Sequence, residues 1–342
     1  MRRCIDKNSL LLLLAALLLV LLFLFNLFYG AVRIPFADVL SVLTGGETER
    51  EAWRLIVLET RLPQAVTALL SGAAISVAGL LLQTLFNNPL AGPEVLGING
   101  GAGLGVAVVM LLLQGFFVVG GMGLAGYLAV FVGAFAGAAV IMAIILFLSS
   151  MLRNKVLLLI VGVAVGYLAS SLITVLNYFA TAEGVHSYMI WGMGSFGAVS
   201  MDQLPLFAIL TTTLLAVSLL MMKPLNVMLL GDAYAHNLGV NVKVVRNTLL
   251  VIVGMLTAVV TAFCGPIAFI GLAVPHMARL LLQSNNHKVL LPATLLIGAI
   301  VALVCNIVCQ LPGESGMLPL GAITPVIGAP VIIYVVFKNR SF

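Results

Sequence analysis

The sequence predicts an all-α integral membrane protein of about ten transmembrane helices, organised as a single domain over residues 1–342. The first observation behind this prediction is composition. Hydrophobic residues make up 62% of the chain and charged residues 8%, whereas a soluble domain carries about 25% charged residues. The second is length, because 342 residues hold about ten spans of about 20 residues with short connections. Such a chain has too little polar surface to face water on all sides.

Apolar segments recur along the whole chain and are separated by short polar connections. The predicted spans are residues 9–29, 61–86, 97–114, 119–149, 155–180, 204–222, 247–264, 267–283, 289–309 and 322–337. Two of them, 267–283 and 322–337, are short for a hydrocarbon layer of about 30 Å. The segment 119–149 is long enough to be tilted or broken. We expect all ten to cross the membrane.

The first span also resembles a secretory signal peptide, because Arg2, Arg3 and Lys7 precede an apolar run over residues 10–25. A signal peptide ends in a cleavage site made of small residues. No such site follows here, since the residues at 26–29 are all bulky. We therefore expect this segment to remain in the protein as a membrane anchor.

Basic residues predict the orientation of the spans, since Lys and Arg accumulate in cytoplasmic connections. With both termini in the cytoplasm, 12 of the 16 Lys and Arg residues fall inside. The other four are Arg33, Arg50, Arg54 and Arg61. The net charge of +5 fits this orientation and does not indicate nucleic-acid binding, because no basic run reaches five residues or alternates with aromatic residues.

Asp, Glu, Lys and Arg residues are absent from the middle of every predicted span. Carriers driven by an ion gradient, charged-ring channels and voltage sensors usually keep such groups inside the membrane. Their absence argues against an ion-coupled secondary transporter and favours a conduit whose energy comes from elsewhere.

Glycines predict how the spans pack and also exclude one kind of chemistry. Pairs four residues apart form flat strips that allow two helices to approach closely, and they occur at Gly101/Gly105, Gly133/Gly137 and Gly162/Gly166. The glycine-rich run 97–103 lacks the Lys-Ser/Thr of a phosphate-binding loop. No Walker motif occurs elsewhere, so we expect the chain not to hydrolyse ATP.

A polar segment over residues 223–246 interrupts the apolar sequence on the predicted cytoplasmic side. Lys223 precedes it, and Lys243 and Arg246 follow. About 24 residues are far more than a turn between two spans requires, and apolar residues recur among the polar ones. The pattern predicts short surface helices with a contact face. We interpret the segment as the binding site for a cytosolic partner that moves the membrane-embedded part.

Several motifs, taken together, resemble one known family. They are Arg61-Leu62-Pro63, residues 71–79, residues 83–91, Leu96-Gly97, Gly231-Asp232 with Leu238-Gly239-Val240, residues 265–279 around Pro275-His276, and residues 318–330. In this order they resemble the permease subunits of bacterial ABC importers for iron chelates, haem and cobalamin, the FecCD-type family, over residues 55–340. Each motif alone would be weak, but the ordered set is specific.

The resemblance implies a type II ABC importer fold with ten transmembrane helices per subunit in the bacterial inner membrane. It also implies three kinds of protein partner: a cytosolic ATPase dimer, a periplasmic substrate-binding protein and a second permease subunit, most simply an identical copy. ATP and Mg²⁺ would be used by the ATPase, and this chain would bind no cofactor. ATP binding would then drive alternating access through the 223–246 segment.

The resemblance assigns three groups of residues. ATPase coupling falls on Gly231, Asp232, Ala235, Leu238, Gly239 and Val240, where Asp232 is also a candidate helix cap. The translocation path falls on Met189, Trp191, Met193, Ser195 and Phe196, whose adaptable side chains suit a bulky ligand that must not bind tightly. Docking of the binding protein falls on Arg61 and, by proximity, Arg54. Many relatives carry further docking arginines where this chain has Gln64 and Gln310.

Histidine and cysteine residues do not predict a metal site. His276 has no further ligand residue at suitable spacing, so we expect a polar residue beside a helix bend at Pro275. Cys305 and Cys309 lie one helical turn apart, where a disulfide is poorly placed. We expect these two, with Cys4 and Cys264, to be small apolar residues.

We therefore expect the permease subunit of an ATP-driven importer that moves a metal chelate, such as an iron–siderophore or haem, from periplasm to cytoplasm. A cobalamin importer of the same family is the alternative. An intramembrane enzyme would need a nucleophile and base or metal ligands within the spans, and a scaffold would not need the 223–246 segment. The motifs do not decide which cargo is carried or whether the two permease subunits are identical.

Overall fold

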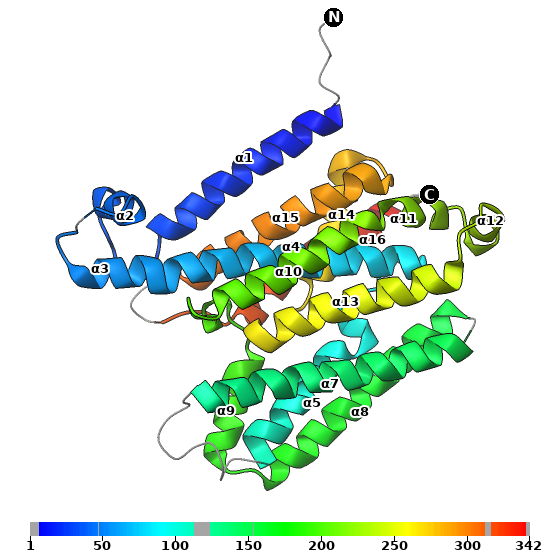
Figure 1. The fold of residues 1–342 in the computed structure, drawn as a ribbon, viewed down its shortest axis with the longest axis horizontal. Helices are drawn as coiled ribbons and strands as arrows, with labels where there is room; N and C mark the ends of the chain where they lie inside the picture. The colour runs from blue at the N-terminus through cyan, green and yellow to red at the C-terminus, as the bar shows by residue number, and fades with distance from the viewer. Residues whose placement is uncertain (1–6, 47, 113–123, 153, 312–315, 340–342) are drawn as a thin grey trace, which may run out of the picture.

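A computed structural model describes residues 7–46, 48–112, 124–152, 154–311 and 316–339 of the chain (Figure 1). In this part of the chain the secondary structure is helical throughout, without any strand. The first half comprises α1 (Lys7–Phe28), α2 (Phe36–Leu43), α3 (Glu51–Leu55), η1 (Ile56–Arg61), α4 (Leu62–Phe86), η2 (Pro93–Leu96), α5 (Ile98–Ala107), η3 (Val108–Leu112), α7 (Leu124–Met151) and α8 (Lys155–Phe179).

The second half begins with two short helices and continues with longer ones. It comprises α9 (Ala182–Gly192), η4 (Phe196–Ala198), α10 (Leu204–Leu220), α11 (Met222–Met228), α12 (Asp232–Asn237), α13 (Val242–Cys264), α14 (Ile270–Leu282), α15 (His287–Cys309) and α16 (Leu320–Asn339).

Each of the ten predicted spans overlaps an apolar helix. Six helices are long and apolar enough to cross a membrane, and α10 with α11 forms a seventh candidate span bent by 49°. Three shorter apolar helices, 98–112, 270–282 and 320–335, account for the remaining predictions. Parts of the predicted spans 97–114 and 119–149 lie outside the described residues. The all-α membrane fold is therefore confirmed.

Two predicted boundaries are wrong by several residues. The second span begins not at 61 but at Glu51, because α3 and the π-helix η1 continue into α4 as one long helix. Likewise α13 begins at Val242 and not at 247. The reason is the same in both cases: hydropathy marks where the bilayer ends, whereas helical hydrogen bonding continues into the polar connection.

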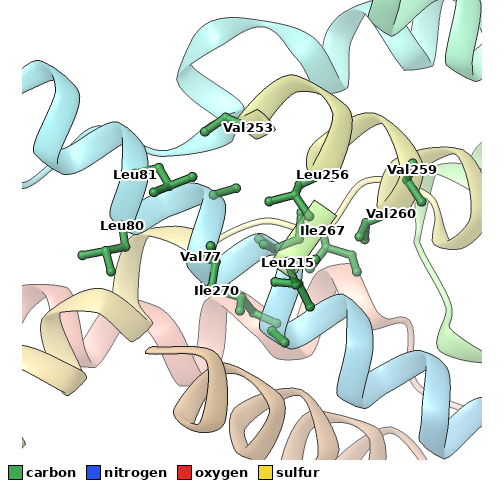
Figure 2. Close-up of a cluster of buried hydrophobic side chains, with 14 of the residues drawn as sticks. Val77, Leu80, Leu81, Leu215, Val253, Leu256, Val259, Val260, Ile267 and Ile270 are labelled. Carbon is green, nitrogen blue, oxygen red and sulfur yellow. The ribbon is translucent and has the colours of Figure 1, made fainter. Parts of the chain in front are cut away.

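The core surrounds α4, which packs against α10, α13, α14 and α15. Small residues over 71–79 let these neighbours approach, so that α4 is buried on every side. Figure 2 shows branched side chains from four helices meeting here. They are Val77, Leu80 and Leu81 of α4, Leu215 of α10, Val253, Leu256, Val259 and Val260 of α13, and Ile270 of α14, with Ile267 just before it. Because lipid is as apolar as this core, close packing and not water exclusion holds these helices together.

The three predicted glycine strips all lie at close helix contacts. A Cβ atom at Gly105 would lie 1.9 Å from the carbonyl oxygen of Gly133, and one at Gly137 would lie 2.0 Å from that of Gly101. These four glycines join α5 to α7. Gly162 and Gly166 of α8 receive the backbone around Gly97. The prediction that glycine serves packing is therefore confirmed.

The long helices run side by side, with α1 along one edge of the molecule and α8 along the opposite edge (Figure 1). The short helix α12 lies at one end of the bundle, and α2 and α9 lie at the other. We refer to these as the α12 end and the α9 end. A second, small cluster of buried residues, Ile34, Val39, Val42 and Val57, joins α2 to η1 at the α9 end.

Candidate functional site

The segment predicted to contact a cytosolic partner forms α11 and α12 at one end of the bundle. Ala235 is buried and fixes α12 to the molecule, whereas most of the surrounding segment is exposed. Large apolar side chains are among the exposed ones, namely Leu229, Leu230, Tyr234 and Leu238. An exposed apolar cluster at the polar end of a membrane protein is typical of a protein contact surface.

Glycines with positive φ bound α12 on both sides, with φ of 93° at Gly231 and 81° at Gly239. A Cβ atom at either position would meet no atom within 4 Å. Glycine is needed here for its backbone conformation and not for packing, because positive φ is costly for other residues. These two residues therefore set the angle at which α12 projects from the bundle.

Asp232 does not occupy the capping position that the sequence suggested. The N-cap of α12 is Gly231, which has no side chain with which to cap the helix. Asp232 is instead the first helical residue, where a carboxylate still interacts favourably with the helix dipole. Val240 is half-buried, and its N–H donates to the Ala235 carbonyl. Of the six predicted coupling residues, Ala235 and Val240 thus hold the segment in place, and Gly231, Asp232, Leu238 and Gly239 are exposed.

A surface pocket of about 630 Å³ adjoins α12. It is lined by Ser150, Leu152, Asp232, Ala233, His236, Val242, Lys243 and Arg246, from the ends of α7, α12 and α13. The Arg246 guanidinium donates to the carbonyls of Ser149 and Leu152, and so caps the last turn of α7 with a positive charge. The α12 end therefore offers a hollow as well as an apolar cluster.

The predicted path segment lies at the α9 end as a short helix followed by a tight turn. The Thr181 and Ser195 side chains cap α9 and η4 by accepting from Gly184 and Gly197. The Ser195 N–H donates to the Cys264 carbonyl at 2.8 Å, and the Gly321 N–H donates to the Met193 carbonyl at 2.8 Å. These bonds fix the turn to the ends of α13 and α16.

The five predicted path residues do not share one exposure. Met189 and Met193 are exposed, and Trp191 and Ser195 are half-buried. Phe196 is only 2% exposed and belongs to the core, so it is the least accessible of the five, and its role in the path stays a prediction. Met193, Ser195 and Phe196 do border a cavity of about 180 Å³, which Gln64, Asn306 and Cys309 also line.

The two predicted docking arginines have opposite surroundings. Arg54 is exposed and borders a surface pocket of about 630 Å³ together with Glu51 and Glu59. Arg61 is 4% exposed. Its guanidinium donates to the Leu27 and Phe28 carbonyls at 2.9 Å each, and to the Val32 carbonyl. A docking role for Arg61 does not fit this geometry, because its donors already bind the last turn of α1 and the residues after it.

Gln64 and Gln310 are not at the surface either. Gln64 donates to Asn306 Oδ1 at 2.9 Å, Asn306 donates to Asn26 Oδ1 at 2.8 Å, and Gln310 lies within 3.4 Å of Gln64 Oε1. All four side chains are buried. In place of surface charge, these positions contribute to a chain of carboxamides that links α1, α4 and α15.

Neither His276 nor the described cysteines form a metal site. His276 is buried, and its Nε2 lies 2.8 Å from the Pro89 carbonyl oxygen. Cys264, Cys305 and Cys309 are free and buried, which confirms the expectation of small core residues for these three. Cys4 lies outside the described residues. Within the part of the chain that the structure describes, no three His, Cys, Asp or Glu side chains could hold a metal ion.

The sequence reasoning missed one face of α8. Among the exposed residues of this helix are Ser170, Ser171 and Thr174 with Tyr167 and Tyr178, and beside them Leu168, Leu172, Val175 and Phe179. At 3.6 residues per turn the first set shares one side and the second set the adjacent side. Apolar side chains are favoured where a helix contacts lipid, so the side with the Leu, Val and Phe residues suits lipid. The polar side then faces water or protein. The polar residues within the predicted span 155–180 could have indicated this face from the sequence.

A buried carboxyl group at the α4–α5 connection was also missed. Glu94 lies in η2, and burial raises the pKa of its carboxyl group, whereas hydrogen bonds from the backbone N–H groups of Glu94 and Phe269 act to lower that pKa. Phe269 is the N-cap of α14. The carboxyl group thus occupies the N-terminal end of a helix inside the bundle, where a negative charge is stabilised.

Comparison with known sequences gives a match over nearly the whole chain. The sequence model of the FecCD transport family matches residues 18–338. Among curated proteins, the vitamin B12 import system permease protein BtuC of Salmonella typhi is 37% identical over 315 residues, which cover 90% of this chain and 94% of that protein. BtuC of Salmonella typhimurium shows the same identity and coverage.

Comparison with solved structures agrees with the sequence match. An inward-facing conformation of a metal-chelate type ABC transporter superposes with a TM-score of 0.81 at 28% sequence identity. The match covers 96% of this chain and 99% of that one. The arrangement of all the spans described above is therefore that of a type II ABC importer permease.

Proposed function

Since this chain belongs to the FecCD transport family and is a permease subunit of an ABC importer, we propose that it carries a bulky metal chelate across the bacterial inner membrane by alternating access. The observation on which the proposal rests is the exposed apolar cluster on α12 in a chain with no Walker motif. Such a permease needs a separate source of energy, and α12 is the surface where that source would bind.

The partner at the α12 end is a cytosolic ATPase dimer that uses ATP and Mg²⁺. Lys223, Lys243 and Lys288 lie at this end, and Arg33, Arg50 and Arg54 precede α4 at the other. Because basic residues favour the cytoplasm, this supports a cytoplasmic α12 end and two cytoplasmic termini. A periplasmic binding protein would deliver the cargo to the α9 end, where Arg54 is the exposed candidate contact.

The path would lie along the polar side of α8, between this chain and a second permease subunit. That face is poorly suited to lipid because several polar side chains gather on it, although the Thr174 hydroxyl donates to the Ser170 carbonyl within α8 at 2.9 Å. A second, identical copy is the simplest subunit that would complete a path on this edge of the molecule. Met189 and Met193 would border the outer mouth, where thioether side chains give an adaptable apolar wall.

Two cargo classes remain as candidates. The structural neighbour is of metal-chelate type, which supports an iron–siderophore or haem as cargo. The 37% identity to vitamin B12 permeases over 90% of the chain supports cobalamin, itself a cobalt chelate, as the second candidate. Both are bulky, and neither requires an ionisable residue within the spans.

Uptake into proteoliposomes tests the proposal. The permease is reconstituted with its ATPase and binding protein, and a ferric siderophore, haem and cobalamin are each offered outside with ATP inside. We expect uptake of one of the three that depends on ATP and on the ATPase subunit. Uptake without the ATPase, driven by a proton or sodium gradient, would instead identify an ion-coupled transporter.

A further inference from the structure

The short helix α12 rests mainly on two elements, α11 and α13. Any movement of α12 must therefore enter the membrane-embedded bundle through one of these two. Helix α13 continues directly from the segment, whereas α11 contacts α15 and α4, the centre of the core. Both α11 and α13 therefore connect α12 to α4, and of the two α11 also contacts the start of α15.

One side chain of α11 makes three hydrogen bonds to the start of α15. Asn226 Oδ1 accepts from the backbone N–H of His287 at 2.8 Å and lies 3.0 Å from His287 Nδ1. Asn226 Nδ2 donates to Asn286 Oδ1 at 2.9 Å. The Asn286 side chain in turn accepts from the Lys288 N–H as the N-cap of α15. Asn226 therefore completes the cap of α15 from a different helix, because the first turn of a helix leaves its N–H groups without partners.

The same histidine continues the contact into α4. His287 Nε2 lies 2.8 Å from Thr84 Oγ1, and His287 is only 1% exposed. A neutral imidazole with its proton on Nδ1 donates from Nδ1 to Asn226 and accepts at Nε2 from the Thr84 hydroxyl, whose single hydrogen is shared with the Leu80 carbonyl 3.0 Å away. Three elements, α11, α15 and α4, are thus joined by Asn226, His287 and Thr84.

Helix α15 extends from this junction to the opposite end of the bundle. It is one continuous helix of 23 residues with Pro292 inside it, so its backbone connects His287 directly to the far end. That end carries Asn306 and Cys309, which line the 180 Å³ cavity beside Met193 and Ser195. The junction and the outer mouth therefore lie at the two ends of the same helix.

We propose that Asn226, His287 and Thr84 transmit the movement of α12 to α15 and α4, and so connect the ATPase contact to the outer mouth. This inference rests on the proposed function and deepens it by naming the route. The three are positioning residues: they touch neither cargo nor nucleotide. Loss of any one leaves α12 able to bind the ATPase but disconnects it from α15.

The test is an Asn226→Ala substitution in the complete importer, with Asn285→Ala as the matched control. Asn285 is exposed and lies two residues before His287, and no side-chain hydrogen bond of Asn285 occurs among the described residues. For Asn226→Ala we expect ATP hydrolysis to persist while the ratio of cargo transported to ATP hydrolysed falls about tenfold, as is typical of a lost coupling energy. Asn285→Ala should keep the wild-type ratio.

Conservative variants separate transmission from folding. Asn226→Leu keeps a similar side-chain volume but removes the acceptor for both His287 N–H groups, so it should lower the ratio as Ala does, whereas a merely space-filling role would let Leu keep the wild-type ratio. Thr84→Val should lower the ratio in the same direction. A bimane label at Leu311→Cys, just after α15, reports movement there through its fluorescence. In a Cys4→Ser background this fluorescence should change on addition of ATP, and it should not change when Asn226→Ala is added to the same background.

Two negative outcomes are distinguishable. If the wild-type complex shows no ATP-dependent uptake of any chelate, the proposed function fails. If the wild type transports and Asn226→Ala transports with an unchanged ratio and an unchanged bimane response, movement enters through α13 and the proposed route is wrong.

Discussion

Arg54 and Arg61 are seven residues apart on one continuous helix, yet their surroundings give them different tasks. The guanidinium of Arg61 binds three backbone carbonyls in and after the last turn of α1. These groups have no partner within their own helix, and α1 has few other neighbours besides α15. Arg61 thus holds the N-terminal span against α4. Arg54 faces solvent and does not hold α1 in place.

Arg61→Gln should destabilise the protein without affecting its contact surfaces directly. Hydrogen bonds from a charged donor contribute about 1.5–3 kcal/mol, and glutamine can replace only part of them. We expect a loss of about 2 kcal/mol, or a fall in Tm of about 3 °C for a chain of this size, in detergent. An unchanged Tm would mean that water replaces the guanidinium at the end of α1.

Arg54→Gln is the matched substitution on the same helix. Stability should stay within error, because the side chain is exposed. Binding of the periplasmic partner should weaken by about fivefold at most, since an exposed ion pair contributes about 0–1 kcal/mol, and the loss should diminish at high salt. Surface plasmon resonance at two salt concentrations measures this. Equal affinity at low salt would exclude Arg54 from the docking surface.

Residue roles were the part of the site least accessible from sequence. A motif match indicates which positions matter, but it does not indicate where a side chain points. Arg61 turns inward because the carbonyls at the end of α1 need donors, and Gln64 and Gln310 join Asn26 and Asn306 for the same reason. The exposure of these side chains depends on neighbours distant in sequence, 34 positions away for Arg61 and Leu27 and 242 for Gln64 and Asn306, and hydropathy along the chain does not contain that information.

At the scale of elements, the closest helix contact in the core is between α4 and α14. A Cβ atom at Gly79 would lie 1.7 Å from the carbonyl oxygen of Gly271, so Gly79→Ala forces two backbones apart. Overpacking costs about 1–3 kcal/mol, and backbone contacts cannot relax by rotamer changes. We expect little folded protein in size-exclusion chromatography. Gly192→Ala is the control, because a Cβ there meets no atom within 4 Å and yield should be unaffected.

Gly239 tests whether the angle of α12 matters for transport. With φ of 81°, a β-branched residue is strongly disfavoured, whereas Asn tolerates positive φ. Gly239→Val should therefore reduce ATP-driven uptake severalfold while the transmembrane bundle remains intact, and Gly239→Asn should retain most of it. Measuring both uptake and thermal unfolding for each variant separates a loss of transport from a loss of folding. If Val and Asn variants transport equally, the backbone at 239 is not a determinant of coupling.

Elements were far more predictable than residues. The spans follow from apolar runs because lipid requires satisfied backbone groups, and helices satisfy them internally. The glycine strips at 101/105 and 133/137 follow because only small residues allow such approach. The π-helix η1 and the 49° bend between α10 and α11 lie just before Pro63 and Pro224, which disrupt regular helical hydrogen bonding. A proline signals that the helix changes there, but it does not predict whether the change is a π-helix or a bend.

At the scale of the whole molecule, the centre of the described part of the chain is packed with side chains. The core around α4 is filled by branched side chains (Figure 2), and α8 lies at the edge of the bundle (Figure 1). The proposed path therefore lies where the polar side of α8 would meet another subunit. Two copies arranged about an axis beside α8 would place both sets of hydroxyl groups around the same space, and α12 of each copy would face one ATPase.

Cysteine accessibility along α8 tests this arrangement in nanodiscs. A thiol reacts as the thiolate, which forms only where water reaches it, so Ser171→Cys and Thr174→Cys should react with a hydrophilic reagent at least about tenfold faster than Leu168→Cys and Leu172→Cys. The native Cys264, Cys305 and Cys309 are buried, so a Cys4→Ser background suffices. If the variants at 168 and 172 react as fast, α8 faces water on both sides and is not a boundary between path and lipid. If those at 171 and 174 are as slow, the hydroxyl groups are sealed in a helix contact, and the path must lie elsewhere.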